Sequence, residues 1–264
     1  METSNPQLWD RVWSQATKTE RDRDFWQWVN RESDGVRGTK IKQYLSQHLG
    51  GLQNLKTIEV GSGPGIYSFI FACLGAQVTL LDYSPQALAI AKERFAANGL
   101  SATFLSQDAL KLDPALYNQY DLAMSFGTVE HFRYPERFRM VEAHLKLVRA
   151  GGAIAVSTPN RAFILHELLK AYLQRCNKWQ LGYEGAFSRN EFLNLAQKLK
   201  LHHPKIVGSA FLSDFQRYLN IYRSTQFAQR ILGTTTQSKS ILERSSWLDN
   251  YWGADLVLLG LKNA

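Results

Sequence analysis

Residues 55–65 read Leu-Lys-Thr-Ile-Glu-Val-Gly-Ser-Gly-Pro-Gly, and this stretch decides the fold. The apolar residues before Gly61 predict a short buried strand, and the apolar pattern over 66–74 predicts a helix directly after the glycines. Alternate glycines let the backbone turn sharply and approach a ligand with no Cβ in the way. The first turn of a helix offers unpaired N–H groups that suit a carboxylate or a phosphate. The stretch therefore predicts a strand, loop and helix that bind a nucleotide-type ligand, or else a tight turn that uses the same glycines.

Three further apolar runs predict strands at 77–83, 102–107 and 120–126. Asp82 ends the first of them, Asp108 follows the second and Gly127 follows the third. The carboxyl ends of parallel strands meet at one edge of a sheet, so these residues predict a ligand site at that edge. Asp82 lies 21 residues after Gly61, where a βαβ nucleotide fold places an acid against ribose hydroxyls.

Strand and helix patterns alternate regularly between residues 55 and 158. Helices are predicted at 66–74, 85–97 and 135–148, and further strands at 153–157, 205–212 and 254–262. Such alternation predicts a parallel sheet with helices on both faces. We expect residues 1–50 to form a helical cover and residues 51–264 to form the ligand-binding domain, with helical insertions at about 160–187 and 213–250.

The form Glu59-Val60-Gly61-Ser62-Gly63-Pro64-Gly65 resembles motif I of class I methyltransferases that depend on S-adenosylmethionine (SAM). Motifs II, III and IV of that family resemble Leu80-Leu81-Asp82-Tyr83-Ser84, Gln107-Asp108-Ala109 and residues 125–132, Ser-Phe-Gly-Thr-Val-Glu-His-Phe. The resemblance covers roughly residues 40–158 and, weakly, the final strand. It implies SAM as the cofactor and an α/β fold: a Rossmann-like seven-stranded sheet, parallel with an antiparallel last strand, with helices on both faces and helical lid insertions.

The resemblance also implies roles for single residues. Glu59 and the glycine loop would hold the methionine end of SAM, and Asp82 the ribose. Tyr83 would face the adenine ring and Asp108 its amino group. The full set of implied cofactor-binding residues is Glu59, Gly61, Ser62, Gly63, Gly65, Asp82, Tyr83, Asp108, Ala109, Phe126 and Gly127. The plainer interpretation of the two aspartates is strand-end capping or turn formation.

Glu130 and His131 follow the fourth predicted strand, at the mouth of the predicted pocket. Histidine titrates near neutrality and is the usual general base, so we expect His131 to be catalytic and Glu130 to orient it. A structural role for this histidine is the alternative. Carboxylates in this region contribute to a metal site in some quinone O-methyltransferases, but no second acidic cluster is visible in the sequence, so no metal is expected.

The net charge of +8 is concentrated after residue 150, where 14 Lys and Arg face 7 Asp and Glu. This excess suits an anionic small-molecule acceptor, an acidic membrane surface or nucleic acid, or it is a solvated basic face. The two cysteines, Cys73 and Cys176, are expected to be buried, reduced thiols of a cytoplasmic protein. The sequence contains no 18-residue apolar run and no signal-peptide pattern at its start.

Residues 161–177 predict an amphipathic helix beside the acceptor pocket. Its apolar face consists of Ile164, Leu165, Leu168, Leu169, Tyr172, Leu173 and Cys176, opposite His166, Glu167, Lys170, Gln174 and Asn177. We favour a lid whose apolar face is buried against the core or a second subunit. A homodimer is therefore one of the alternatives. The alternative is peripheral membrane contact through 161–178, because basic amphipathic helices bind anionic interfaces. Quinone-biosynthesis methyltransferases, which the stretch Ser-Thr-Pro-Asn-Arg at 157–161 loosely resembles, act near membranes on lipid-like acceptors.

Three other functions agree less well with the sequence. A nicotinamide oxidoreductase would need a glycine where Ile66 stands in the G-x-G-x-x-G pattern. A nucleic-acid methyltransferase tends to carry Asn/Asp-Pro-Pro-aromatic where this chain has Ser-Phe-Gly-Thr at 125–128, so nucleic acid is not expected. A non-catalytic SAM-binding subunit remains an alternative, since folds do not determine function. We expect methyl transfer to an O or N atom of an anionic, aromatic or lipid-like small molecule.

Overall fold

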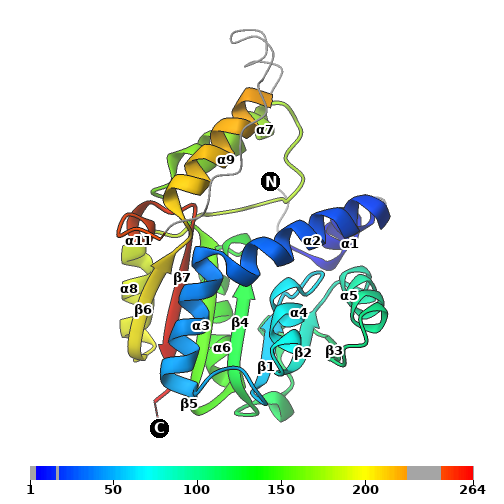
Figure 1. The fold of residues 1–264 in the computed structure, drawn as a ribbon, viewed down its shortest axis with the longest axis vertical. Coiled ribbons are helices and arrows are strands. Elements are labelled where there is room, and N and C mark those ends of the chain that lie inside the picture. The colour runs from blue at the N-terminus through cyan, green and yellow to red at the C-terminus, as the bar shows by residue number, and fades with distance from the viewer. Residues whose placement is uncertain (1–3, 16–17, 225–244, 264) are drawn as a thin grey trace.

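A seven-stranded sheet forms the centre of the computed structural model, which describes residues 4–15, 18–224 and 245–263 (Figure 1). Its strands lie in the order β3-β2-β1-β4-β5-β7-β6. Strands β1 to β5 pair in parallel, and β7 runs antiparallel between β5 and β6. The strands are β1 (Lys56–Val60), β2 (Gln77–Asp82), β3 (Thr103–Ser106), β4 (Tyr120–Phe126), β5 (Val148–Pro159), β6 (His202–Gly208) and β7 (Asp255–Leu261). The predicted fold class, α/β with an antiparallel last strand, is confirmed.

Helices cover both faces of the sheet. The helices on one face are α3 (Val36–Leu49), α4 (Ile66–Cys73) and α5 (Pro85–Ala97), and those on the other are α6 (Glu136–Leu147) and α8 (Arg189–Lys198). The remaining helices are α1 (Pro6–Ser14), α2 (Lys18–Asp34), α7 (Ile164–Arg175), α9 (Phe211–Ser224) and α11 (Asp249–Trp252), with short 3₁₀ turns at Ala109–Lys111, Pro114–Leu116 and Val129–His131. Because both faces are covered, the central strands are almost continuously apolar, as parallel sheets usually are.

Gly65 joins the glycine loop to α4 and brings the helix close to β2. Its φ is +73°, and a Cβ built there would lie 2.3 Å from a methyl carbon of Leu80. We expect Gly65→Ala to lower the free energy of unfolding by about 1–3 kcal/mol, because it adds overpacking to backbone strain. Gly99→Ala is the matched control, because Gly99 has a φ of +65° and open space around it. Equal losses for both variants in urea denaturation would contradict a packing role for Gly65.

The C-terminal part differs from the prediction. A strand was expected over 205–212, but β6 ends at Gly208 and α9 begins at Phe211. Gly208 packs so closely on α11 that a Cβ there would lie 1.8 Å from the carbonyl oxygen of Asp249. This contact turns the chain away from the sheet. The predicted insertion at 213–250 is represented by α9 and residues 245–250, and its remainder, 225–244, lies outside the described residues.

Both cysteines are unpaired and exposed, so the prediction that they are buried is wrong. Cys73 ends α4 on the solvent side, and Cys176 follows the last turn of α7. Nothing in the residue pattern distinguished a core cysteine from a surface one. Among the helices within the described ranges, none has the length and apolar character needed to cross a membrane.

Two helices and a connecting segment form a lid above the carboxyl ends of the parallel strands (Figure 1). The lid consists of α7, residues 176–187 and α9, and α7 and α9 lie side by side. Within this chain the apolar face of α7 is only partly buried, since Leu165 and Leu169 are half-buried, and its burial against a second subunit stays a prediction. Ile164 and Leu168 are 62% and 53% exposed, whereas Lys170, predicted on the polar face, is the buried residue. On the polar face, His166 and Lys170 contact the buried carboxylate of Glu184.

Candidate functional site

A cavity of about 580 Å³ lies at the carboxyl ends of β1, β2 and β4, between the N-terminal helices and the lid. This volume is in the usual range for small-molecule sites. Gly65 is the one predicted site residue that does not line it. Those that do are Glu59, Gly61, Ser62, Gly63, Asp82, Tyr83, Asp108, Ala109, Phe126, Gly127, Glu130 and His131. The structure therefore brings the residues of all four motifs to one cavity.

The glycine loop forms the floor of the cavity. The N–H of Gly61 donates to the carbonyl of Leu81 at 2.8 Å, which ties the loop to the end of β2. Gly63 has a φ of +50°, and a Cβ built there would lie 2.9 Å from the ring of Trp13. The loop thus needs glycine for its conformation, and α1 covers it from above.

Asp82 fixes the loop from the end of β2. One carboxylate oxygen accepts from the N–H of Gly63 at 2.8 Å, and the other accepts from the N–H of Ser84 at 2.8 Å. Burial raises the pKa of Asp82, and these two hydrogen bonds oppose the rise. The carboxylate keeps further lone pairs that can accept from ligand hydroxyls. Turn capping, the plainer interpretation, and ligand binding are therefore compatible at this residue.

Glu59 caps the helix that follows the loop. Its carboxylate accepts from both the N–H and the hydroxyl of Ser68, at 2.9 and 2.6 Å. Burial raises the pKa of Glu59 to about 7, against the effect of the hydrogen bonds from Ser68, and Asp82 adds to the rise. The sequence predicted that the free N–H groups in the first turn of α4 would bind a ligand anion. One of them, that of Ser68, donates to Glu59 instead.

The rest of the predicted cofactor site is aromatic and polar. The hydroxyl of Tyr83 hydrogen-bonds that of Ser4, which accepts from the indole N–H of Trp9 at 3.0 Å. Phe126 stacks on Tyr67 with ring centroids 3.4 Å apart. Asp108, the acidic residue of motif III, caps the 3₁₀ turn Ala109–Lys111 and borders the cavity.

His131 lies in the wall of the cavity and is 5% exposed. Its Nδ1 lies 2.8 Å from the carbonyl oxygen of Tyr183. A carbonyl only accepts, so Nδ1 carries the proton and Nε2 presents a lone pair. Burial lowers the pKa of His131, against the effects of this hydrogen bond and of Glu184. The imidazole is therefore held neutral and oriented, as a general base requires.

Glu130 was expected to orient His131, but the carbonyl of Tyr183 does so instead. The carboxylate of Glu130 is 2% exposed, and its Oε2 has no hydrogen-bond partner among the described residues. Burial, followed by the charge of Glu184, raises the pKa of Glu130 well above its ordinary value. A neutral carboxyl group that borders the cavity can donate a hydrogen bond to a ligand.

Several lining residues had no signal in the sequence. Arg37 forms a buried ion pair with Glu32 at 2.8 Å, and Asp255 lies 2.9 Å from the same guanidinium. The pKa of Glu32 falls to about 2 because the charge and hydrogen bonds of Arg37 outweigh burial. Glu184 enters from the lid. These residues come from α2, α3, β7 and residue 184, and no motif spacing relates them.

Comparison with known proteins agrees with this geometry. The family described as "Methyltransferase domain" matches residues 58–152. The ubiquinone biosynthesis O-methyltransferase of Nitrosomonas europaea is 32% identical over 177 residues, which is 64% of this chain and 72% of that protein. The chain belongs to the SAM-dependent methyltransferase family. The enzyme of the same name from Erwinia tasmaniensis is 33% identical over 118 residues, and the chain spans about half the length of that relative, 48%.

Solved structures of this methyltransferase family share the fold. Magnesium protoporphyrin IX methyltransferase from Synechocystis PCC 6803, solved with S-adenosylhomocysteine (SAH), gives a TM-score of 0.56 at 14% identity over 97% of this chain and 93% of that one. A SAM-dependent methyltransferase from Thermotoga maritima gives 0.56 at 19% identity over 97% and 99%. At such identities the likeness concerns the fold alone.

The residues of this methyltransferase fit SAM, the cofactor of the family. Ser62 lines the cavity, and its hydroxyl is buried without a hydrogen-bond partner in the described part of the chain. A buried polar atom without a partner is costly, so a ligand atom is the natural partner for this hydroxyl. Asp82 retains acceptor capacity beside it, and the glycines leave the floor open. We expect Ser62, Asp82 and Asp108 to hold the cofactor.

Proposed function

We propose that the protein transfers a methyl group from SAM to an O or N atom of a small-molecule acceptor, with His131 as the general base. The observation that carries the proposal is the neutral, oriented His131 in the same cavity as the glycine loop and Asp82. The relatives named ubiquinone biosynthesis O-methyltransferases, at 32% and 33% identity, support a small-molecule acceptor.

Bound SAM supplies an electrophilic methyl group on a sulfonium. The chain aligns the acceptor with the methyl group, excludes water from the cavity and provides a proton acceptor. Trp9 packs its ring edge to face with His131, with centroids 4.8 Å apart, and keeps water from that wall. Nε2 of His131 accepts the proton of the acceptor hydroxyl or amine as it reacts. Positioning and base catalysis are the contributions that a methyltransferase of this kind requires.

Calorimetric titration tests the cofactor part of the proposal. SAM and SAH should bind, while NAD and NADP should not. The acceptor part needs a screen of hydroxyl- and amine-bearing metabolites, read out as SAH formation. Binding of NAD in place of SAM would overturn the proposal. SAM binding without SAH formation from any acceptor would favour the non-catalytic subunit, and methylation of DNA or RNA in the same assay would favour the nucleic-acid alternative.

A non-catalytic or different use of the cofactor is the second candidate. The [4+2]-cyclase SpnF shares the fold with a TM-score of 0.54 at 16% identity, over 85% of this chain and 80% of that one. The fold alone therefore does not establish methyl transfer. The buried acid–base group of Glu130 and His131 at the cavity favours transfer chemistry over binding alone.

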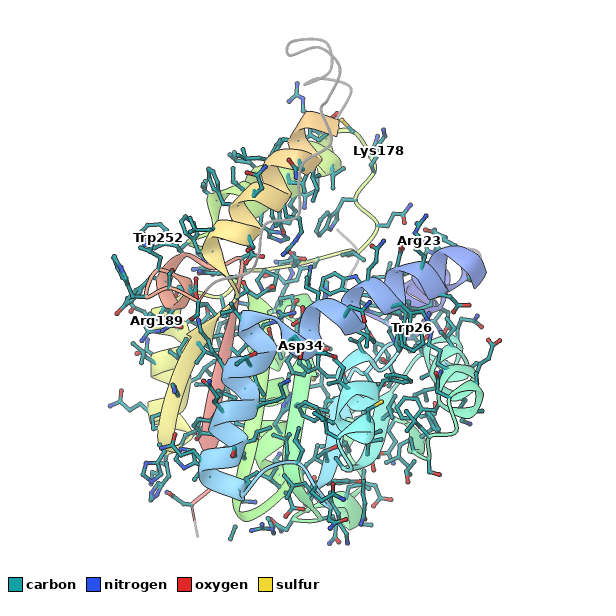
Figure 2. The ribbon with its side chains drawn as sticks, viewed as in Figure 1. Arg23, Trp26, Asp34, Lys178, Arg189 and Trp252 are labelled. Carbon is teal, nitrogen blue, oxygen red and sulfur yellow. The ribbon has the colours of Figure 1, made fainter. Side chains whose placement is uncertain are left out.

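We also propose that the lid contacts an anionic membrane surface and that the protein is cytoplasmic. Helices α7, α9 and α11 each expose large apolar side chains, among them Leu168, Leu212 and Trp252, the last of which is labelled in Figure 2. The basic residues Arg175 and Lys178 follow at the end of α7 and are exposed. Exposed apolar groups beside cations are the pattern of an interfacial site.

Flotation with vesicles rich in phosphatidylserine checks this location. Wild-type protein should float at low salt, and binding should fall when Ile164 and Leu168 become Ser, and when Arg175 and Lys178 become Gln. Leu193→Ser on α8 is the matched control, since Leu193 is 47% exposed away from the lid. Absence of flotation at low salt overturns the proposal. Self-association that the Ile164 and Leu168 substitutions abolish would then assign this face to a second copy of the chain.

A further inference from the structure

Glu184 of the lid lies directly beside the acid–base pair of the cavity. The carbonyl of Tyr183, one residue before it, receives the Nδ1 proton of His131 at 2.8 Å. The N–H of Gly185, one residue after it, donates to the carbonyl of Glu130 at 2.9 Å. These two hydrogen bonds hold Glu184 against residues 130 and 131. Its carboxylate is buried and lines the same cavity.

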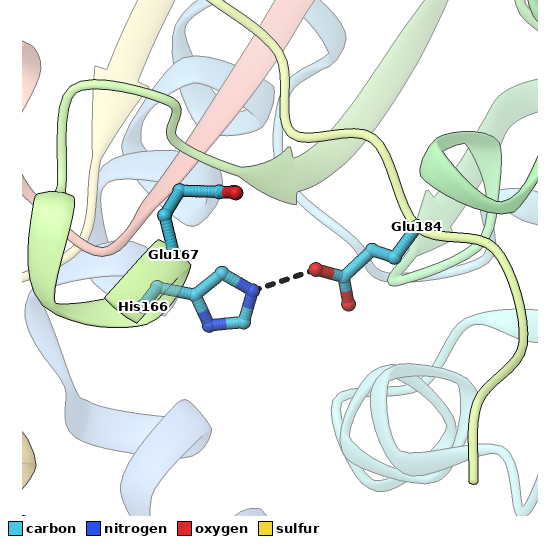
Figure 3. A group of neighbouring side chains, drawn as sticks. All are labelled: His166, Glu167 and Glu184. Carbon is cyan, nitrogen blue, oxygen red and sulfur yellow. Dashed lines mark hydrogen bonds and ion pairs between the residues drawn. The ribbon is translucent and has the colours of Figure 1, made fainter. Parts of the chain in front are cut away.

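A hydrogen-bond chain from both lid helices orients this carboxylate, and Figure 3 shows its link between His166 and Glu184. Nε2 of His166 lies 2.7 Å from Oε1 of Glu184, so the Nε2 proton is donated to the carboxylate. Nδ1 of His166 lies 2.8 Å from the hydroxyl of Tyr218 on α9. Lys170 lies 3.5 Å from the same Oε1. No hydrogen bond within the described residues reaches Oε2, which leaves that oxygen for a ligand.

Lys170 is shared between two carboxylates of the lid. The ammonium of Lys170 lies 2.8 Å from Glu167, closer than its 3.5 Å from Glu184. Lys170 therefore neutralises Glu184 only in part. Burial alone would raise the pKa of Glu184, but the hydrogen bond from His166 and the nearby charge of Lys170 lower it, so this carboxylate stays ionised.

Carboxyl side chains outnumber cationic ones in the cavity, in contrast to the basic sequence around it. Eight Asp and Glu side chains and two Arg line it, and no Lys of the described ranges does. One of the arginines, Arg37, is already paired with Glu32 and Asp255. Oε2 of Glu130, beside Glu184, is buried without a partner in the described chain. The net charge of +8 thus predicts the wrong sign for a ligand of this cavity.

We propose that Oε2 of Glu184 binds a protonated amine of an aromatic acceptor, while Nε2 of His131 faces the atom that is methylated. The inference rests on the proposed function and adds the class of acceptor: an aromatic compound with a cationic amine in addition to its nucleophilic group. Eight aromatic side chains line the cavity, and Trp9 borders His131. Aromatic faces and carboxylates together favour organic cations. The anionic acceptor expected from the net charge is disfavoured.

A metal ion is the other cation that this corner could take. The ligand atoms of His166, Glu167 and Glu184 lie within 4.8 Å of one another. The ammonium of Lys170 already bonds the two carboxylates, so a metal would have to displace a tethered cation. The geometry therefore favours an amine at the open Oε2 over a metal among the three ligands.

Calorimetry on the SAH-saturated protein tests the proposal with three phenols of similar size. These are tyramine, which is cationic, 4-propylphenol, which is neutral, and 3-(4-hydroxyphenyl)propanoate, which is anionic. Tyramine should bind at least about 10-fold more tightly than 4-propylphenol, because a charge-assisted hydrogen bond distinguishes them. The propanoate should bind most weakly. Glu184→Gln should reduce the preference for tyramine to about twofold or less, with unchanged affinity for SAH.

Glu167→Gln is the matched control, since it removes a carboxylate from the same cluster that does not line the cavity. This variant should keep most of the preference for tyramine. Equal affinity for the three phenols, no measurable affinity for tyramine, or a preference that survives in Glu184→Gln overturns the inference. A preference that disappears in EDTA and returns with Mg²⁺ would also overturn it, in favour of a metal. Loss of SAH binding in the wild type would instead refute the proposed function.

Discussion

Replacing Asp82 by alanine is expected to weaken SAM binding about 100-fold. Each charge-assisted hydrogen bond to a ligand hydroxyl contributes about 1.5–3 kcal/mol. The carboxylate also accepts from the N–H groups of Gly63 and Ser84, so its removal loosens the glycine loop that forms the cavity floor. Isothermal titration of SAM and SAH into wild type and variant measures the effect, and thermal unfolding without ligand separates it from a loss of stability.

Asp113→Ala provides the matched control. Asp113 caps a 3₁₀ turn by accepting from the N–H of Ala115 at 2.9 Å, and it does not line the cavity. This variant should lose a little stability and no SAM affinity. Unchanged SAM affinity in Asp82→Ala would mean that Asp82 only caps a turn, and the cofactor assignment would then be wrong.

The part of the fold that the sequence predicted is the part that local patterns encode. The strand before Gly61, the helix Pro85–Ala97 and the strand at 120–126 were all predicted within a residue or two of their observed ends. Short apolar runs, a proline at a helix start and glycine turns act within a few residues. The four motifs follow successive strands of one sheet, so their order alone brought their residues to one edge.

The lid could not be predicted in the same way. Periodicity predicted an apolar and a polar face for α7, but it could not establish which of them packs inward, and the buried residue is Lys170 of the polar face. That choice depends on Glu184, which receives a hydrogen bond from His166 and lies near Lys170. Glu184 has no signature in the sequence, because its partners lie on α7 and its position is fixed by hydrogen bonds that Tyr183 and Gly185 make with residues 131 and 130. Contacts between distant segments also explain why the approach of Asp255 to Arg37 was not foreseen.

Replacing His131 by alanine is expected to lower turnover by about 10²–10⁴-fold, the usual range for loss of a general base. SAM affinity should change little, because His131 lies in the wall formed by residues 130, 131 and 184 rather than in the glycine loop. His131→Gln is the informative companion. Its amide N–H can still donate to the carbonyl of Tyr183, but it cannot take a proton. Both variants should therefore be equally slow, whereas recovery in the Gln variant would indicate a positioning role.

The pH dependence of turnover follows from the lowered pKa of His131. Its base-competent form is the neutral imidazole, and burial extends that form to lower pH than the ordinary pKa of about 6.5 would allow. The rate should therefore rise with pH, with an acid-limb midpoint below about 6.5, and level off above it. The same limb should be absent from both variants, because neither carries the titrating group. The measurement is kcat against pH for any acceptor that the screen identifies, and a limb that persists in His131→Ala would assign the proton acceptor to another residue.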